Sequence, residues 1–275
     1  MRIKGLLAFS SVFKAIPHRN YIQNVTILTL HLLSIYALFF TPVTMKYLVI
    51  FLISVYLRLF FVSAGIHRYF SHKSFYLKRW SQFVFAVLCS LCLQNSVFWW
   101  AARHRRHHKK ADSNEDPHFH KKGFFWSHIG WIMADDDQIN PKIISDLYNY
   151  PELVFIHKYY QVLNFLFPLA IYFIFGFNCF LWVYCLGTVA SWHLTFIVNS
   201  IGHKVGYRNF STSENSKNIS ILNILTIGES LHNNHHARPS YPNNKVLWHE
   251  LDLTYCGLWV LSLIGIVKFR KNHVK

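Results

Sequence analysis

The feature that most limits the fold of this chain is an uncharged stretch from residue 159 to residue 203, which contains no Lys, Arg, Asp or Glu. In a helix that rises ~1.5 Å per residue, a stretch of this length can cross a hydrocarbon layer ~30 Å thick twice. Gly176-Phe177-Asn178 is the expected turn between the two crossings. The stretch therefore predicts two membrane-spanning helices, at about residues 162–175 and 179–198.

Two further apolar segments precede this stretch. Residues 21–40 carry no charged side chain, and residues 47–64 carry only Arg58, which we expect either to snorkel to the interface or to face the interior of the bundle. Residues 83–100 are also uncharged, but Gln94, Asn95 and the Trp99-Trp100 pair favour a helix lying in the membrane interface. Four spanning helices are therefore predicted. Composition agrees, because 15% of the residues are charged, against about 25% in soluble proteins.

The positive charges indicate the orientation in the membrane. Four of the Lys and Arg residues precede the first predicted span, 13 lie between the second and third spans, and none lies in the Gly176 turn. Because Lys and Arg accumulate in cytoplasmic loops, both termini and the regions 65–160 and 199–275 are predicted to be cytoplasmic. No cleavable signal peptide is evident. We expect one all-α integral membrane domain over residues 1–275, with four spanning helices and a cytoplasmic helical cap, in a bacterial inner membrane or the endoplasmic reticulum.

The net charge of +16 fits either nucleic acid or anionic lipid and acidic substrates. The apolar segments favour the membrane, so no nucleic-acid partner is expected. The cysteines lie mostly inside apolar segments and are interpreted as packing residues.

Histidines recur in short motifs beside the apolar segments. His104, His107 and His108 are spaced i, i+3, i+4 and so share one helix face. The same spacing returns at the third motif, whereas His67 and His72 would diverge by ~140° on a regular helix, so a helix end or bend is expected at His72. The nine histidines on the same predicted side of the membrane are His67, His72, His104, His107, His108, His203, His232, His235 and His236.

Neutral imidazoles suit iron, copper and zinc. Nine exceed the four ligands of a tetrahedral zinc site, so two metal ions are predicted. No ligand role is predicted for the acidic residues. Two redox metals beside a membrane favour oxygen activation against a lipid C–H bond, because zinc hydrolysis would need fewer ligands and a general base. A non-catalytic alternative is a set of basic, His-rich loops that bind lipid phosphates or metal.

Several motifs together resemble the membrane fatty acyl-CoA desaturases of the stearoyl-CoA delta-9 type, over about residues 55–265. They are Gly65–His72, Trp100–His108, Asp116-Pro117-His118, Gly123–Trp131, Asn199–His203 and Gly228–His236. The resemblance implies an oxidoreductase that uses O2 and two iron ions to desaturate a long-chain fatty acyl substrate. It also implies an external electron donor of the ferredoxin, rubredoxin or cytochrome b5 type. An acyl-lipid desaturase and a membrane di-iron hydroxylase of a lipid or hydrocarbon are the alternatives.

The resemblance also implies roles for individual residues, with no catalytic residue separate from the metal ligands. One iron would be bound by His67, His72, His104, His108 and His236, and the other by His107, His203, His232 and His235. Asn199 would hold a metal-bound water. Apart from the resemblance, the other nine histidines are expected to have structural positions, with His118 and His128 as the two that could support the ligands. The bent acyl tunnel would be lined by Gln94, Asn95, Trp192 and Thr195, with Phe51 and Val55 narrowing its closed end.

One segment departs from the family pattern. Ala134-Asp135-Asp136-Asp137 stands where animal acyl-CoA members carry a basic pair, and its carboxylates would repel the phosphates of CoA. The substrate head group is therefore left open. It is either CoA, bound by Arg103, Arg105, Lys109 or Lys122, or a phospholipid, or an acyl carrier protein.

Overall fold

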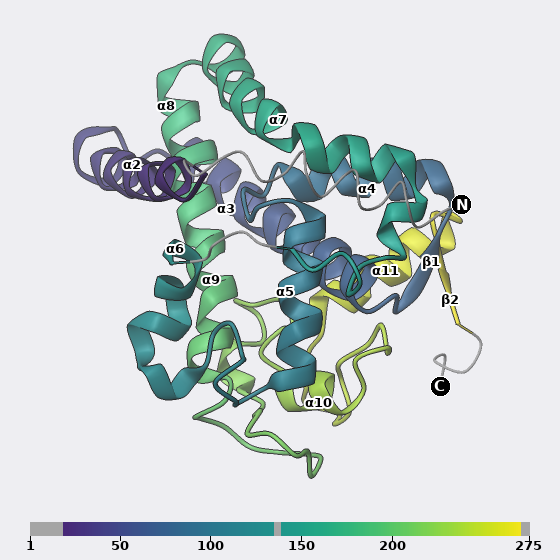
Figure 1. Cartoon of the computed structure of the whole chain (residues 1–275). Coiled ribbons are helices and arrows are strands. Elements are labelled where there is room, and N and C mark those ends of the chain that lie inside the picture. Colours follow the sequence, from purple (N-terminus) through teal and green to yellow (C-terminus); the bar gives the residue numbers. More distant parts are fainter. Residues whose placement is uncertain (1–18, 135–138, 271–275) are drawn as a thin grey trace.

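The computed structural model describes residues 19–134 and 139–270, and its helices occupy all four predicted spans (Figure 1). The first is α2 (Arg19–Phe40), and the second is α3 (Met45–Phe60), which continues into the π-helix η1 (Phe61–Ser71). The third is α7 (Pro151–Phe175). The fourth begins with α8 (Phe177–Cys179) and η5 (Phe180–Leu186) and ends with α9 (Gly187–Ile201).

Three of these helical segments are long and apolar enough to cross a membrane, over residues 21–40, 45–71 and 177–201. The helix α7 is as long but is not among them, and its first half carries Glu152, Lys158 and Gln161. The sharp turn between α7 and α8 is made at Gly176, whose positive φ of 83° is easily adopted by glycine.

Close helix packing builds the bundle. The helix α2 packs on η5 and α9, and α3 packs on the same two elements. Gly187 lets α9 approach α3, because a Cβ at this position would lie 2.7 Å from Oγ of Ser54. The hydroxyl of Ser54 in turn donates to the carbonyl of Val183 at 2.6 Å.

The π-helical turn explains how His67 and His72 come together. A π-helix bonds residues five apart, so side chains at i and i+5 lie closer to one face than they do in an α-helix. Helix η1 ends at Ser71, which confirms the expected helix end at His72. Gly65 allows this helix to lie against α4, since a Cβ there would lie 2.3 Å from Sγ of Cys89.

Residues 83–100 do not form the single interfacial helix that the sequence predicts. They belong to α4 (Arg79–Ser90) and α5 (Val97–Lys110), which are separated by a turn. Leu93 and Asn95 adopt positive φ values of 54° and 63° in this turn, and Ser96 caps α5 by accepting a bond from the backbone N–H of Trp99. The break redirects the chain, so that α5 carries its histidines toward η1.

The remaining elements are short, and one small sheet corrects the all-α prediction. Strand β1 (Phe75–Leu77) pairs antiparallel with β2 (Val267–Phe269), with Tyr76 opposite Lys268. Helix α11 (Leu253–Leu263) precedes β2 and packs on η1. The others are η2 (His120–Lys122), η3 (Trp126–Gly130), α6 (Trp131–Met133), η4 (Leu147–Asn149), η6 (Ser220–Leu222) and α10 (His232–Ala237).

Buried apolar side chains join η1, which carries His67, to α5, which carries His104, His107 and His108. Ile66 and Phe70 of η1 pack in one cluster with Phe98 of α5, Leu153 of α7 and Leu258 of α11. Burial of such side chains typically contributes about 1.5–3 kcal/mol each. This core holds the position of α5 relative to η1.

Candidate metal centre

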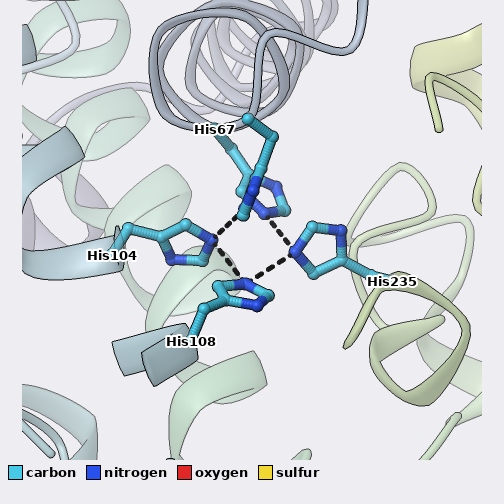
Figure 2. A group of neighbouring side chains, drawn as sticks. His67, His104, His108 and His235 are labelled. Atoms are coloured by element: carbon cyan, nitrogen blue, oxygen red, sulfur yellow. Dashed lines mark hydrogen bonds between the residues drawn. The ribbon is translucent and has the colours of Figure 1, made fainter. Parts of the chain in front are cut away.

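Five imidazoles from three parts of the chain meet in a first cluster, formed by His67, His72, His104, His108 and His235. Figure 2 shows the rings of His67, His104, His108 and His235 turned toward a common centre. Nε2 of His104 lies 2.8 Å from Nε2 of His72 and 3.0 Å from Nε2 of His108. Nε2 of His235 lies 2.9 Å from the same atom of both His108 and His67.

A second cluster lies beside it and contains His107, His203, His232 and His236. Nε2 of His203 lies 3.0 Å from Nε2 of His232, and Nε2 of His107 lies 3.2 Å from Nε2 of His236. The two clusters are adjacent, because the rings of His108 and His236 stack with centroids 4.3 Å apart. All nine predicted histidines therefore gather in one region.

Helix geometry decides which histidine joins which cluster. In α5, His104 and His108 are four residues apart and face the first cluster, whereas His107 faces the second. In α10 the pattern is reversed, since His232 and His236 stay together in the second cluster and His235 crosses to the first. This corrects the division implied by the resemblance, which exchanged His235 and His236 and so separated an i, i+4 pair.

Carboxylates fix the outward nitrogens of two rings and lie near those of two others. Nδ1 of His67 donates to Glu229, and Nδ1 of His107 lies 2.9 Å from Oδ1 of Asp116. Because a carboxylate accepts, Nδ1 carries the proton and Nε2 presents its lone pair to the cluster. Nδ1 of His203 lies 3.1 Å from Oδ1 of Asp112, and Glu214 lies 3.7 Å from Nδ1 of His236.

Glu229 is itself held by a buried ion-pair network. Arg68 donates to Oε1 of Glu229 at 2.8 Å and to Oδ2 of Asp252 at 2.7 Å. Burial by itself would raise the pKa of Glu229, but His67 and Arg68 outweigh it and hold this pKa well below its usual value. Glu229 is therefore ionised and fixes the ring of His67.

Burial also favours the neutral form of seven of the imidazoles. It lowers the pKa of His108 to about 3, with neighbouring imidazoles adding to the effect. The same causes lower the pKa values of six other cluster members, His72, His104, His107, His232, His235 and His236. Neutral imidazole is the form that binds a metal ion.

The donor geometry of the first cluster fits a transition-metal ion. Two nitrogens bound at ~2.1 Å to one ion and at right angles would lie about 3.0 Å apart, close to the 2.8–3.0 Å measured in the first cluster. Lone pairs aimed at one another repel unless a cation or proton lies between them. The histidine clusters are thus compatible with metal binding.

An apolar cavity of about 320 Å³ leads to these clusters. Of the predicted substrate-binding residues, Gln94, Asn95, Arg103, Trp192 and Thr195 line it. Asn199, His104 and His118 also border it, where it approaches the two clusters. Nε2 of Gln94 donates to the hydroxyl of Thr195 at 3.1 Å, and its oxygen accepts from the indole of Trp100 at 3.2 Å.

Several residues lie away from this cavity. Arg105 is bound to Asp146 and to the carbonyls of Phe70, Ser71 and Ile143, so it has a structural position. Phe51 packs on Trp182, and Val55 packs in a separate cluster with Leu59 and Ile227, so neither lines the cavity. Lys109 and Lys122 do not line it either. Residues 135–137 of the acidic segment lie outside the described residues.

The other histidines have separate environments. The ring of His118 lies 4.1 Å from that of His107, close enough to support it. His128 on η3 instead contacts α9, because its Nε2 lies 2.9 Å from Nδ1 of His193. Nε2 of His193 lies in turn 3.0 Å from Nε2 of His31 on α2. His157 bonds to Ser96. His18 and His273 lie outside the described residues.

The carboxylates around the clusters are the functional candidates that sequence analysis missed, namely Asp112, Asp116, Glu214 and Glu229. One local signal was present, since Glu229 and His232 have Glu-x-x-His spacing. The contact of Glu229 is with His67, however, and it could only be found in the folded structure.

Fold and site together define a helical membrane protein with two adjacent histidine clusters at the end of an apolar cavity. A sequence model described as fatty acid desaturase matches residues 42–256. The chain belongs to the fatty acid desaturase family, which is a family of oxidoreductases.

Curated relatives agree with this assignment. The chain is 35% identical over 214 residues to an sn-1 stearoyl-lipid 9-desaturase of Synechocystis sp., covering 75% of this chain and 66% of the relative. It is 31% identical over 259 residues to an sn-1 stearoyl-lipid 9-desaturase of Anabaena variabilis, covering 91% and 93%. It is 30% identical over 266 residues to a probable acyl-CoA desaturase of Schizosaccharomyces pombe, covering 90% and 54%.

Proposed function

We propose that this protein introduces a double bond at the delta-9 position of a long-chain fatty acyl chain, using O2 and two iron ions. The observation that carries the proposal is the meeting of nine buried or half-buried histidines at an apolar cavity. Acyl-lipid and acyl-CoA desaturases both occur among the relatives. These relatives share the desaturation reaction but differ in the head group of the substrate. Each turnover would convert one –CH2–CH2– unit, O2, two electrons and two protons into one –CH=CH– unit and two waters.

The residues have distinct roles in this proposal. The first cluster would hold one iron and the second cluster the other, and iron supplies the redox chemistry for activating O2. Asn199 would hold a water beside the second cluster. Trp99, Trp131 and Trp192 line the cavity and would exclude bulk water from the acyl chain.

The proposal includes the arrangement in the membrane. The chain would be one domain with four spanning helices, α7 in addition to the three apolar segments at residues 21–40, 45–71 and 177–201. The histidine clusters and both termini would face the cytoplasm. The excess of Lys and Arg between the second and third spans supports this orientation. Two electrons would come from a separate redox protein of the ferredoxin, rubredoxin or cytochrome b5 type.

The test is the fatty acid profile of cells expressing the chain, with the double bond located by dimethyl disulfide derivatisation and mass spectrometry. A new delta-9 double bond and roughly two irons per purified chain are expected, given that nine ligands exceed one site. A hydroxylated product would favour the hydroxylase alternative. Absence of iron after expression in iron-replete cells would contradict both and favour a non-catalytic protein.

A further inference from the structure

The apolar cavity opens sideways between two helices. Within its lining, all of which the structure describes, the exposed side chains are Ile22 on α2 and Gln161 and Phe165 on α7. Ile22 is 54% exposed and Phe165 is 66% exposed, whereas the other lining residues are buried or half-buried. Since α2 spans the membrane and α7 is proposed to do so, this opening faces lipid.

The two helices leave a gap because, apart from η5, they pack on different neighbours. Helix α2 packs on η5 and α9, whereas α7 packs mainly on α4 and η5. In Figure 1 they lie on different sides of the column formed by α8 and α9. Tyr184 of η5 forms the floor of the gap, and its hydroxyl donates to the carbonyl of Asn164 at 3.3 Å.

A chain of hydrogen bonds crosses this gap. Nδ2 of Asn95 donates to Oε1 of Gln23 on α2 at 3.3 Å, and the hydroxyl of Tyr160 on α7 donates to Oδ1 of Asn95 at 3.4 Å. Asn95 reaches this place because it sits in the turn between α4 and α5 with a φ of 63°. Both bonds are longer than the usual 2.7–3.2 Å range, so the bridge is weak and easily exchanged.

The polar groups at the opening are uncharged. Amides and a hydroxyl are supplied by Gln23, Asn95, Tyr160, Gln161 and Asn164. Ester and glycerol oxygens accept bonds from such donors, whereas the phosphates of CoA require cations. The lining contains no Lys, Asp or Glu, and its one arginine, Arg103, precedes His104 on α5, whereas the exposed residues lie on α2 and α7.

We propose that the gap between α2 and α7 is a lateral portal for an acyl chain that is still esterified to a membrane glycerolipid. The apolar chain passes between Ile22 and Phe165 toward His104, and the ester end exchanges hydrogen bonds with the Gln23–Asn95–Tyr160 bridge. The inference rests on the proposed desaturase function and assigns its substrate class.

The test places a bulky side chain in the portal. Gln161→Trp fills the opening from α7, and Ile22→Trp fills it from α2 if the first variant folds poorly. Leu166→Trp is the matched control, because Leu166 is exposed on the same helix and does not line the cavity. Each protein is reconstituted in vesicles of 1-stearoyl-2-oleoyl phosphatidylglycerol that contain a trace of the same lipid with a diazirine in its stearoyl chain.

Two readouts are expected to change together. Photolysis of the wild type and of Leu166→Trp should label peptides containing Ile22 or Gln161, and either portal variant should lose this labelling. The kcat/KM for the vesicle lipid should fall by about tenfold or more in a portal variant, with iron content unchanged. Wild-type labelling and turnover in both portal variants would overturn the proposal, as would a wild type that desaturates stearoyl-CoA in detergent but neither labels with nor desaturates the vesicle lipid.

Labelling separates this proposal from the function on which it rests. Specific labelling at the portal without any desaturated product would support the portal and contradict the desaturase function. Desaturation of stearoyl-CoA without portal labelling would support the enzyme and contradict the portal.

Discussion

Nε2 of His67 lies 2.9 Å from Nε2 of His235, although 168 residues separate them in the chain. The two residues lie at the end of the second helical segment and in the short helix α10 near the end of the chain. Their contact requires both motifs to lie on the same side of the membrane. Contacts of the same kind between other pairs of histidines bring the separate motifs together in one site.

Removing one imidazole from either cluster should abolish activity. His107→Ala and His235→Ala each remove a buried ring whose Nε2 faces other imidazoles. We expect loss of the new double bond and a fall in bound iron from roughly two per chain to about one. In each variant only one of the two ions would lose a ligand. Iron is measured by mass spectrometry of purified protein. His249→Ala, at an exposed histidine, is the control and should behave as the wild type.

Loss of the Glu229 carboxylate, which contacts Nδ1 of His67, should weaken metal binding almost as much as loss of a histidine ligand. Glu229→Gln keeps the shape of the side chain but removes the charge that fixes Nδ1 of His67 and pairs with Arg68. Such changes typically weaken metal binding by about 10–100-fold. Iron retention is measured against rising chelator concentration. The neutral control is Glu115→Gln, because Glu115 is exposed and pairs only with Lys110 among the described residues. Equal retention in the two variants would show that Glu229 does not support the site.

Metal removal should destabilise the folded protein. A ligand that binds only the native state stabilises it by about 4 kcal/mol at a thousand times its Kd. Chelation should therefore lower the Tm of the protein in detergent. Added Fe2+ should restore the Tm and Mg2+ should not, because magnesium prefers oxygen ligands. Recovery with Mg2+, or an unchanged Tm after complete chelation, would argue against nitrogen-ligated metal sites.

Gln94 should control where the acyl chain is oxidised. Its amide joins Thr195 to Trp100, whose ring lies 4.8 Å from that of His104. Gln94→Leu would leave the half-buried indole N–H of Trp100 without this acceptor, at a cost of about 1–3 kcal/mol, while the Thr195 hydroxyl keeps its bond to the carbonyl of Ser191. The change would also release the wall beside the first cluster. We expect lower turnover and a mixture of double-bond positions, mapped by dimethyl disulfide derivatisation. Thr195→Val removes one of the two bonds and should have a smaller effect. A single unchanged product from Gln94→Leu would contradict this role.

Local sequence patterns predicted the helices well where one physical requirement dominated. Long uncharged segments predicted helices at 21–40, 47–64, 162–175 and 179–198, because backbone polar groups in lipid must be satisfied within the helix. The same reasoning was less successful at residues 83–100. The turn at Leu93 and Asn95 breaks this segment, and hydropathy does not register a backbone break between apolar residues.

The sequence by itself determined which side chains are available for chemistry, because the spacing of the histidine motifs and their position beside apolar segments are local properties. It did not determine which imidazoles share a cluster, which carboxylates support them, or that Arg105 binds Asp146 while Arg103 lines the cavity. Those relationships join residues far apart in the chain, such as His67, Glu229 and His235. They depend on the relative positions of packed helices, which no local pattern specifies, and only the tertiary structure decided them.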